Sequence, residues 1–303
     1  MNIKQLLSTQ KTTLILVGAL LLIGLAGYFG YQKFFSQPLG PVEEVDLPFD
    51  AEGPYALLFP RRDGNAVILN LKRTASYDSI TYELAYTSLP EEVAIEGSKI
   101  KGTPKPLSGD GEGEGSGGVI DRGVQGTIDT KDKKGEYEQE ILFGTCSKNV
   151  CKYDKGVENG TLTLHIKKGN RAYRMSTQWH LQKPDIALGN LTSGDGHLAY
   201  KLDASREELA NVGFSIVNDV TGVPKLPSGK QVSGKVYALN VPIAKEIKGG
   251  EVSLELAETP ENAKLYRYNF SKSEWEELDT KVDGSKFTAK ASGAGIFAVL
   301  TSK

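Results

Sequence analysis

A run of twenty residues without a charged side chain, from Thr12 to Tyr31, constrains this chain more than any other feature. At a rise of about 1.5 Å per residue, a helix of that length covers roughly 30 Å, the thickness of the hydrocarbon core of a bilayer. The run therefore predicts one transmembrane helix at residues 12–31, preceded by a short cytoplasmic N-terminus at residues 1–11. The membrane is the first partner that the sequence predicts.

Charges on the two sides of this run predict its orientation. Lys4 and Lys11 precede it, whereas the first charged residue after Lys33 is the acidic Glu43. Under the positive-inside rule, the N-terminus stays in the cytoplasm and the rest of the chain lies outside. A cleaved signal peptide is the alternative, but its cleavage site would follow the apolar region, and the best candidate, Gly24–Ala26, lies within it. We expect a single-pass protein of the cell membrane with an extracytoplasmic C-terminal part.

Composition limits the partners and the fold class of the residues that follow the predicted span. Without Lys4, Lys11 and Lys33, the chain keeps 33 basic against 38 acidic residues, a balance that argues against nucleic acid as a partner. Short apolar runs alternate with glycine-bearing turns, and long helical periodicity is almost missing, which predicts a mainly β fold. About 270 residues suffice for two domains of ordinary size.

Breaks in the hydrophobic pattern divide this outer part. Residues 32–54 contain four prolines and no hydrophobic period, which is typical of a stalk. Strand patterns begin after it, and Lys183-Pro184-Asp185 interrupts them. We therefore expect a first β-sandwich domain at residues 55–184 and a second at residues 185–303.

The clearest hairpin of the first domain joins Gly160–Lys167 to Arg171–Gln182 through a Gly169-Asn170 turn. This turn places residue 166 opposite 173 and residue 164 opposite 175, with the apolar side chains, including Trp179, on the core face. His165 then lies on the other face, and His180 lies roughly 20 Å further along, opposite Asn159. The distance excludes a metal site shared by these two histidines.

Cys146 and Cys151 are the only cysteines of the chain. On the outer side of a membrane, two cysteines this close are expected to form a disulfide at the tip of a hairpin. Such a short loop stabilises the fold by roughly 2 kcal/mol. A redox centre would require Cys-x-x-Cys, and a structural zinc site would require two more ligands nearby, so we expect no cofactor.

Ser108–Gly118 is the low-complexity segment of the chain, with the sequence SGDGEGEGSGG. Asp110, Glu112, Glu114 and Asp121 fall on positions one, three, five and twelve of a calcium-binding loop. The match is weak, because glutamate is unusual at the third and fifth positions and no helices flank the segment. Six glycines without an apolar side chain favour a mobile hairpin loop instead.

The second domain contains one predicted short helix and a familiar C-terminal pattern. Ser205 and Glu208 form a capping box that starts the helix, and Gly213 ends it.

From Gly229 the strands read GKQVSGKVYALNVP, GGEVSLELAE, AKLYRYNFSKSEWEELDT and GIFAVLTS. This pattern, about 75 residues long, resembles the closing half of immunoglobulin-like and ZU5-type β-sandwich modules of prokaryotic cell-surface proteins. The resemblance implies an architecture and leaves the function open; Trp275 and Phe297 are expected in the core.

These features favour an interaction or structural module at the cell envelope. Its partner would be an envelope protein; the alternative is a surface receptor for a glycan or small molecule. Neither Gly-x-Ser-x-Gly nor His-Glu-x-x-His occurs, and no P-loop is complete, so no catalytic residue is predicted and the chain is not expected to be an enzyme. An open strand edge or an exposed apolar patch would favour the interaction module.

Overall fold

The computed structural model describes residues 24, 25, 27, 28, 43–90, 119–148, 150–182, 189–209, 213–242 and 247–303. The chain separates into two compact units, Met1–Glu43 and Glu44–Lys303, and the sheets belong to the second. Nearly all of the predicted span, the predicted stalk up to residue 42 and the Gly/Glu loop lie outside the described residues. Among the residues described, no helix is both long and apolar enough to cross a membrane.

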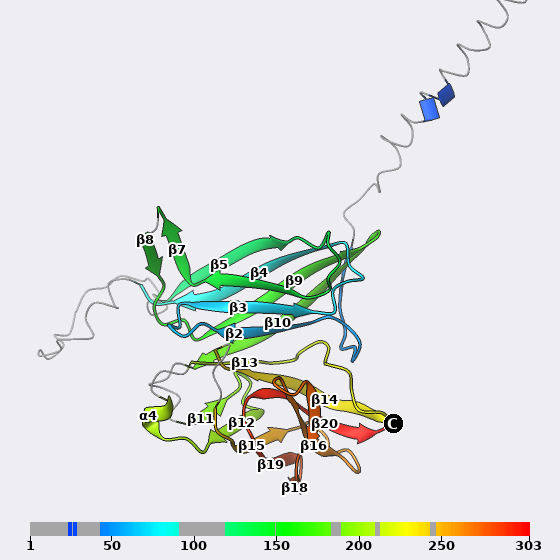
Figure 1. The fold of residues 1–303 in the computed structure, drawn as a ribbon. Coiled ribbons are helices and arrows are strands. Elements are labelled where there is room, and N and C mark those ends of the chain that lie inside the picture. Colours follow the sequence, from blue (N-terminus) through cyan, green and yellow to red (C-terminus); the bar gives the residue numbers. More distant parts are fainter. Residues whose placement is uncertain are drawn as a thin grey trace, which may run out of the picture. The chain divides into compact units, whose positions relative to one another are not determined.

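The described residues of the second unit form strands and one short helix (Figure 1). The elements are β1 (Glu44–Asp46), β2 (Tyr55–Pro60), β3 (Ala66–Lys72), β4 (Ser79–Ser88), β5 (Ile120–Ile128), β6 (Tyr137–Leu142), β7 (Gly144–Ser147), β8 (Val150–Tyr153), β9 (Asn159–Lys168), β10 (Arg171–Gln182), β11 (Asn190–Thr192), β12 (Leu198–Leu202), α4 (Arg206–Leu209), β13 (Phe214–Val217), β14 (Lys230–Asn240), β15 (Gly250–Glu255), β16 (Lys264–Asn269), β17 (Glu274–Glu277), β18 (Lys281–Asp283), β19 (Lys286–Ala291) and β20 (Gly295–Ser302). The predicted mainly β fold is confirmed.

The described strands form four sheets. The main sheet has ten strands in the order β17-β16-β20-β14-β13-β10-β9-β4-β5, with β1 pairing in parallel with β10. A five-stranded sheet has the order β11-β12-β15-β19-β18, a three-stranded sheet the order β2-β3-β6, and β7 and β8 form a separate hairpin. The main sheet therefore contains strands from before and after the predicted domain joint.

The predicted β9–β10 register and the predicted capping box are confirmed. Tyr173 pairs with Ile166 and Met175 with Leu164, as the Gly169-Asn170 turn predicts, and His180 pairs with Asn159. Trp179 is buried in the core. At the start of α4, the backbone N–H of Glu208 donates to Ser205 Oγ, and the Ser205 N–H donates to Glu208 Oε2, which is the predicted capping box.

Two hydrophobic cores lie on opposite faces of the main sheet. The first core, between the main sheet and the three-stranded sheet, includes Leu57, Leu69, Leu71, Ile80, Leu84, Leu162, Leu164, Trp179 and Leu181. The second core, between the main sheet and the five-stranded sheet, includes Leu198, Tyr200, Phe214, Ile216, Val252, Leu254, Phe287 and Phe297. Each core is a sandwich between two sheets, and the main sheet is common to both.

Strands from the C-terminal part of the chain supply side chains to both cores. In β20, Ile296 and Ala298 lie in the first core, whereas Phe297 and Val299 lie in the second. In β14, Ala238 and Tyr237 divide in the same way. Because alternate residues of a strand face opposite sides, a continuous apolar run such as Ile296–Leu300 is expected where both sides are buried.

Contacts across the predicted joint tie the two parts together. β10 pairs with β13 through Trp179 opposite Val217 and Leu181 opposite Ser215. The Ser215 hydroxyl also donates to the backbone oxygen of Leu58 in β2. Residues 183–188, where the joint is predicted, lie outside the described part, so the expected boundary stays a prediction. The described strands on either side of it share one sheet and the first core.

This shared sheet predicts a single cooperative unfolding transition for residues 44–303. Ile296→Ala and Phe297→Ala remove neighbouring side chains from the two different cores, and each should lower the free energy of unfolding by roughly 2–5 kcal/mol. We expect both variants to shift the same transition, measured by urea denaturation with circular dichroism and tryptophan fluorescence. Val282→Ala, at an exposed position of β18, is the control and should change it by less than about 0.5 kcal/mol. Two transitions, each sensitive to only one variant, would contradict the prediction.

Candidate functional site

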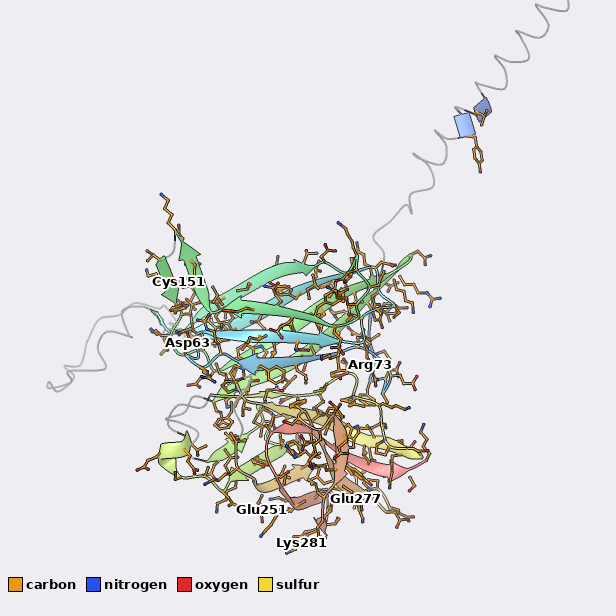
Figure 2. All side chains as sticks on the ribbon, viewed as in Figure 1. Asp63, Arg73, Cys151, Glu251, Glu277 and Lys281 are labelled. Carbon is orange, nitrogen blue, oxygen red and sulfur yellow. A yellow bond between two sulfur atoms is a disulfide. The ribbon has the colours of Figure 1, made fainter. Side chains whose placement is uncertain are left out.

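The disulfide hairpin of β7 and β8 lies at one end of the main sheet. Cys146 and Cys151 are bonded across β7 and β8, with 2.04 Å between the sulfurs, and both residues are exposed; Cys151 is labelled in Figure 2. The predicted disulfide is therefore present. At the base of the hairpin, the buried ring of Phe143 lies between Tyr86 and Trp179, with ring centroids 5.1 and 5.7 Å away. These contacts connect the exposed hairpin to the first core.

The weak calcium candidates are only partly described. Asp121 lies in β5, opposite Thr87 of β4, whereas Asp110, Glu112 and Glu114 lie outside the described residues. Within the described part of the chain, no group of three or more histidine, cysteine, aspartate or glutamate side chains is placed to hold a metal ion. The calcium hypothesis stays a weak prediction.

β5 forms a free edge of the main sheet. It pairs with β4 over all nine residues, from Ile120 opposite Ser88 to Ile128 opposite Ile80, and with no other described strand. Most of its side chains are exposed, and Gly123–Ile128 has no charged residue. Gly126 is required here, because a Cβ at this position would lie 2.4 Å from the Tyr82 ring.

The edge strands β17, β18, β6, β11 and β2 are protected. β17 contains three glutamates, β18 has Lys281 and Asp283 in only three residues, and β6 contains Glu138 and Glu140. β11 is three residues long, and the side chains of β2 are mostly buried. Charges and short length are the devices by which native proteins prevent strand addition. β5 is the one long edge among these without that protection along most of its length.

Exposed apolar side chains gather at the start of this edge. Leu89, Val119 and Ile120 are 41%, 54% and 37% exposed. Ile120 pairs with Ser88 at the start of β5, and Leu89 and Val119 are the next residues beyond this pair. Val150, near the tip of the disulfide hairpin, is 74% exposed. Neighbouring exposed apolar residues are typical of a binding surface.

A polar pocket of about 440 Å³ lies beside the same end of β5. Its wall comes from β4, β5, β9 and β10, from the turn after β11 and from the residue after β13. The lining residues are Ala85, Tyr86, Thr87, Asp121, Arg122, Asn159, Gly160, Thr161, Gln178, Trp179, Gly194 and Asn218. The Trp179 ring packs directly against the backbone of Gly160, where a Cβ would lie 2.4 Å from the indole.

Two lining residues are buried with an unpaired polar atom. Trp179 Nε1 and Asn218 Oδ1 have no hydrogen-bond partner among the described residues, and both residues are 2% exposed. A buried group without a partner costs roughly 1–3 kcal/mol. The backbone of Asn218 is well held, because its N–H donates to Gln178 O at 2.8 Å and its carbonyl accepts from the Thr177 hydroxyl.

Charged groups on one side of the pocket are already satisfied by each other. Tyr86 donates its hydroxyl to Asp154 at 2.8 Å, and Arg122 Nε lies 3.5 Å from the other oxygen of Asp154. Burial, followed by this hydrogen bond, raises the pKa of Tyr86 above its ordinary value. Tyr86 is therefore a neutral donor and no nucleophile at ordinary pH.

His180 holds another lining residue in place. Its Nδ1 lies 2.6 Å from Asn159 Oδ1, and because an amide oxygen only accepts, the imidazole N–H donates. The amide nitrogen of Asn159 stays available for another acceptor. Burial lowers the pKa of His180 below its ordinary value, so the neutral ring is favoured.

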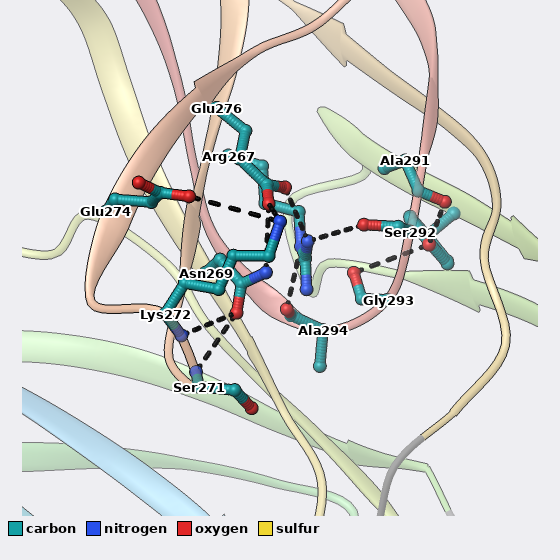
Figure 3. A network of polar contacts seen from close by, with 11 residues as sticks. Arg267, Asn269, Ser271, Lys272, Glu274, Glu276, Ala291, Ser292, Gly293 and Ala294 are labelled. Atoms are coloured by element: carbon teal, nitrogen blue, oxygen red, sulfur yellow. Dashed lines mark hydrogen bonds and ion pairs between the residues drawn. The ribbon is translucent and has the colours of Figure 1, made fainter.

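The best-connected charged cluster lies elsewhere and is structural. Arg267, 5% exposed, donates to Glu276, to Ser292 Oγ and to the backbone oxygen of Ala294 at 2.8–2.9 Å (Figure 3). Glu276 also accepts from Asn269 and Lys272. A buried ion pair with this many partners maintains local geometry and leaves little capacity for a ligand.

No protein-family model, curated protein or solved structure matches this chain. The resemblance to immunoglobulin-like and ZU5-type modules therefore stays an expectation. Of the residues singled out in the sequence, Asp121, Trp179 and Asn159 line the pocket. Thr161 and Gln178 were missed, although the predicted hairpin register places them directly opposite each other on its polar face. Asn218 and Gly194 have no local signal, because they approach only through tertiary pairing.

The partly buried imidazole of His180 predicts a pH dependence of stability. Since the folded state binds the His180 proton more weakly than the unfolded chain, stability should fall as the pH drops from the ordinary histidine value, 6.5, toward the lowered one. His180→Asn keeps a donor near Asn159 and cannot titrate. We expect the free energy of unfolding of the wild type to fall relative to this variant between pH 7.5 and 5, measured by urea denaturation. A constant difference over that range would contradict the assignment.

Proposed function

We propose that this chain is a membrane-anchored extracytoplasmic β protein that binds an envelope protein partner by accepting one of its strands at the free edge of β5. The observation that carries the proposal is the uncharged segment Gly123–Ile128, with Gly123, Gln125 and Thr127 exposed, on an edge with a single described neighbour. In strand addition, backbone hydrogen bonds provide affinity, and side chains of alternate residues provide specificity. Charge, short length or buried side chains protect β17, β18, β6, β11 and β2, which makes β5 the favoured position.

The surroundings of β5 support the same function. The exposed Leu89, Val119 and Ile120 offer apolar contact area where the edge begins. The disulfide hairpin provides a rigid neighbouring element at this end of the sheet. The apolar run at residues 12–31 supports an anchor in the cell membrane, and the resemblance of the C-terminal strands to prokaryotic surface modules supports display outside the cell.

Charges on the edge should abolish partner binding. A photo-cross-linking residue placed at Gln125 on β5 should yield a discrete adduct on intact cells of the native host, because a partner strand would lie within reach. Adding Thr127→Lys should remove most of that adduct, since a lysine on an edge opposes strand addition.

Val282 on β18 is the matched control position, because it is also exposed on an edge strand. A cross-linker there should give no adduct of the same size. Equal adducts from both positions, or an adduct at Gln125 that survives Thr127→Lys, would contradict binding at the β5 edge.

Topology tests the anchor separately. Protease added to intact cells, after removal of any outer layer, should degrade residues 44–303, because the positive-inside rule places them outside. Immunoblotting of the C-terminal part gives the readout, with a cytoplasmic protein as the protected control. Full protection of the C-terminal part would reverse the predicted orientation.

A further inference from the structure

The pocket beside β5 has more hydrogen-bonding capacity than the protein uses. The side chains of Thr87, Asp121, Thr161 and Gln178 form no hydrogen bond or ion pair with another described residue, although all four line the pocket. Trp179 Nε1 and Asn218 Oδ1 also have no partner among the described residues, but both atoms are buried, so a ligand in the pocket meets the four side chains named above. The Asp121 carboxylate only accepts hydrogen bonds, whereas the two hydroxyls and the Gln178 amide both donate and accept, and all four line the same pocket.

The charge of the wall selects against anions. Arg122 is the only cationic residue among the described residues that line the pocket, and Asp154 lies 3.5 Å from its guanidinium. Asp121 has no such counter-charge among the described residues. A phosphate or carboxylate would therefore meet an uncompensated negative charge, which favours a neutral ligand.

The volume and the small residues limit the size of the ligand. About 440 Å³ lies at the lower end of the range for small-molecule sites. A Cβ at Gly194 would lie 3.8 Å from both Asn159 Oδ1 and Asn218 Nδ2, at ordinary contact distance. The absence of a side chain at residue 194 thus leaves open the space above these two amides.

We propose that this pocket binds one neutral polyhydroxylated ring of monosaccharide size, a function beyond partner binding at the β5 edge. Each sugar hydroxyl both donates and accepts, so a ring with several hydroxyls can satisfy the carboxylate, the amides and the hydroxyls of the wall together. The Trp179 ring is 2% exposed and offers no stacking face, so affinity rests on hydrogen bonds alone. A dissociation constant on the order of 1 mM is expected for such a site.

Saturation-transfer NMR on the purified full-length chain in detergent tests the proposal. The probes are the methyl glycosides of glucose, galactose, mannose and N-acetylglucosamine, and at least one should bind with saturable affinity. Gln178→Ala and Thr161→Ala should each weaken it about tenfold, because each removes a hydrogen-bonding group from the wall. Ser176→Ala and Thr163→Ala are the matched controls, two residues along the same strands on the same face, and should leave binding unchanged.

Filling the pocket gives an independent test. Gly194→Leu should abolish binding by occupying the space above Asn159 and Asn218, whereas Gly194→Ala should retain most of it. Thermal melting of both variants checks that the fold is intact. Comparing the bound glycoside with a trisaccharide that ends in the same sugar separates a site for free sugar from a site for a glycan end; both outcomes support the pocket.

Three results would overturn the proposal. The first is that no glycoside shows saturable binding at about 50 mM, far above the expected dissociation constant. The second is that binding persists in folded Gly194→Leu. The third is that inorganic phosphate binds in preference to every sugar. Cross-linking at β5 does not depend on any of these results, so the two functions can fail separately.

Discussion

Burial of both sides of the same strands is the constraint on which this structure depends. β13, β14, β16 and β20 direct alternate side chains into two different cores, so neither core is complete without them. A strand buried on both sides has no face that tolerates polar residues, which explains the unbroken apolar run in β20. Removal of these strands would expose the first core as well as the second. The two parts of the chain are thus joined by shared apolar surface.

β10 connects the strands before the predicted joint to the strands after it within the main sheet. Over its twelve residues it pairs with β9 on one side, while its other side pairs with β1 near Tyr173 and with β13 from Trp179 onward. Between these two neighbours, Thr177 and Gln178 bond instead to the backbone of Asn218. The pocket begins at this change of neighbour, where strand pairing stops and side chains from several elements meet. A polar site beside a change in strand pairing follows from the topology of the sheet.

The ends of the main sheet differ in how they are protected. β17 is short and acidic, whereas β5 is long, exposed and uncharged over most of its length. An unprotected edge is a liability for a soluble domain, because it templates pairing with other chains. The same property is useful where a partner strand is to be bound, and it lies here next to exposed apolar residues and a disulfide hairpin.

The sequence by itself determined what depends on neighbours along the chain. The β9–β10 register, the disulfide between Cys146 and Cys151 and the capping box at Ser205 follow from turn geometry and spacing over a few residues, and the structure confirms all three. Tertiary structure alone decided that β10 pairs with β13, that β5 is an edge and that Asn218 and Gly194 reach the pocket. Those features join residues tens to more than a hundred positions apart, and the alternation of apolar side chains says which face of a strand is buried but not which strand lies beside it.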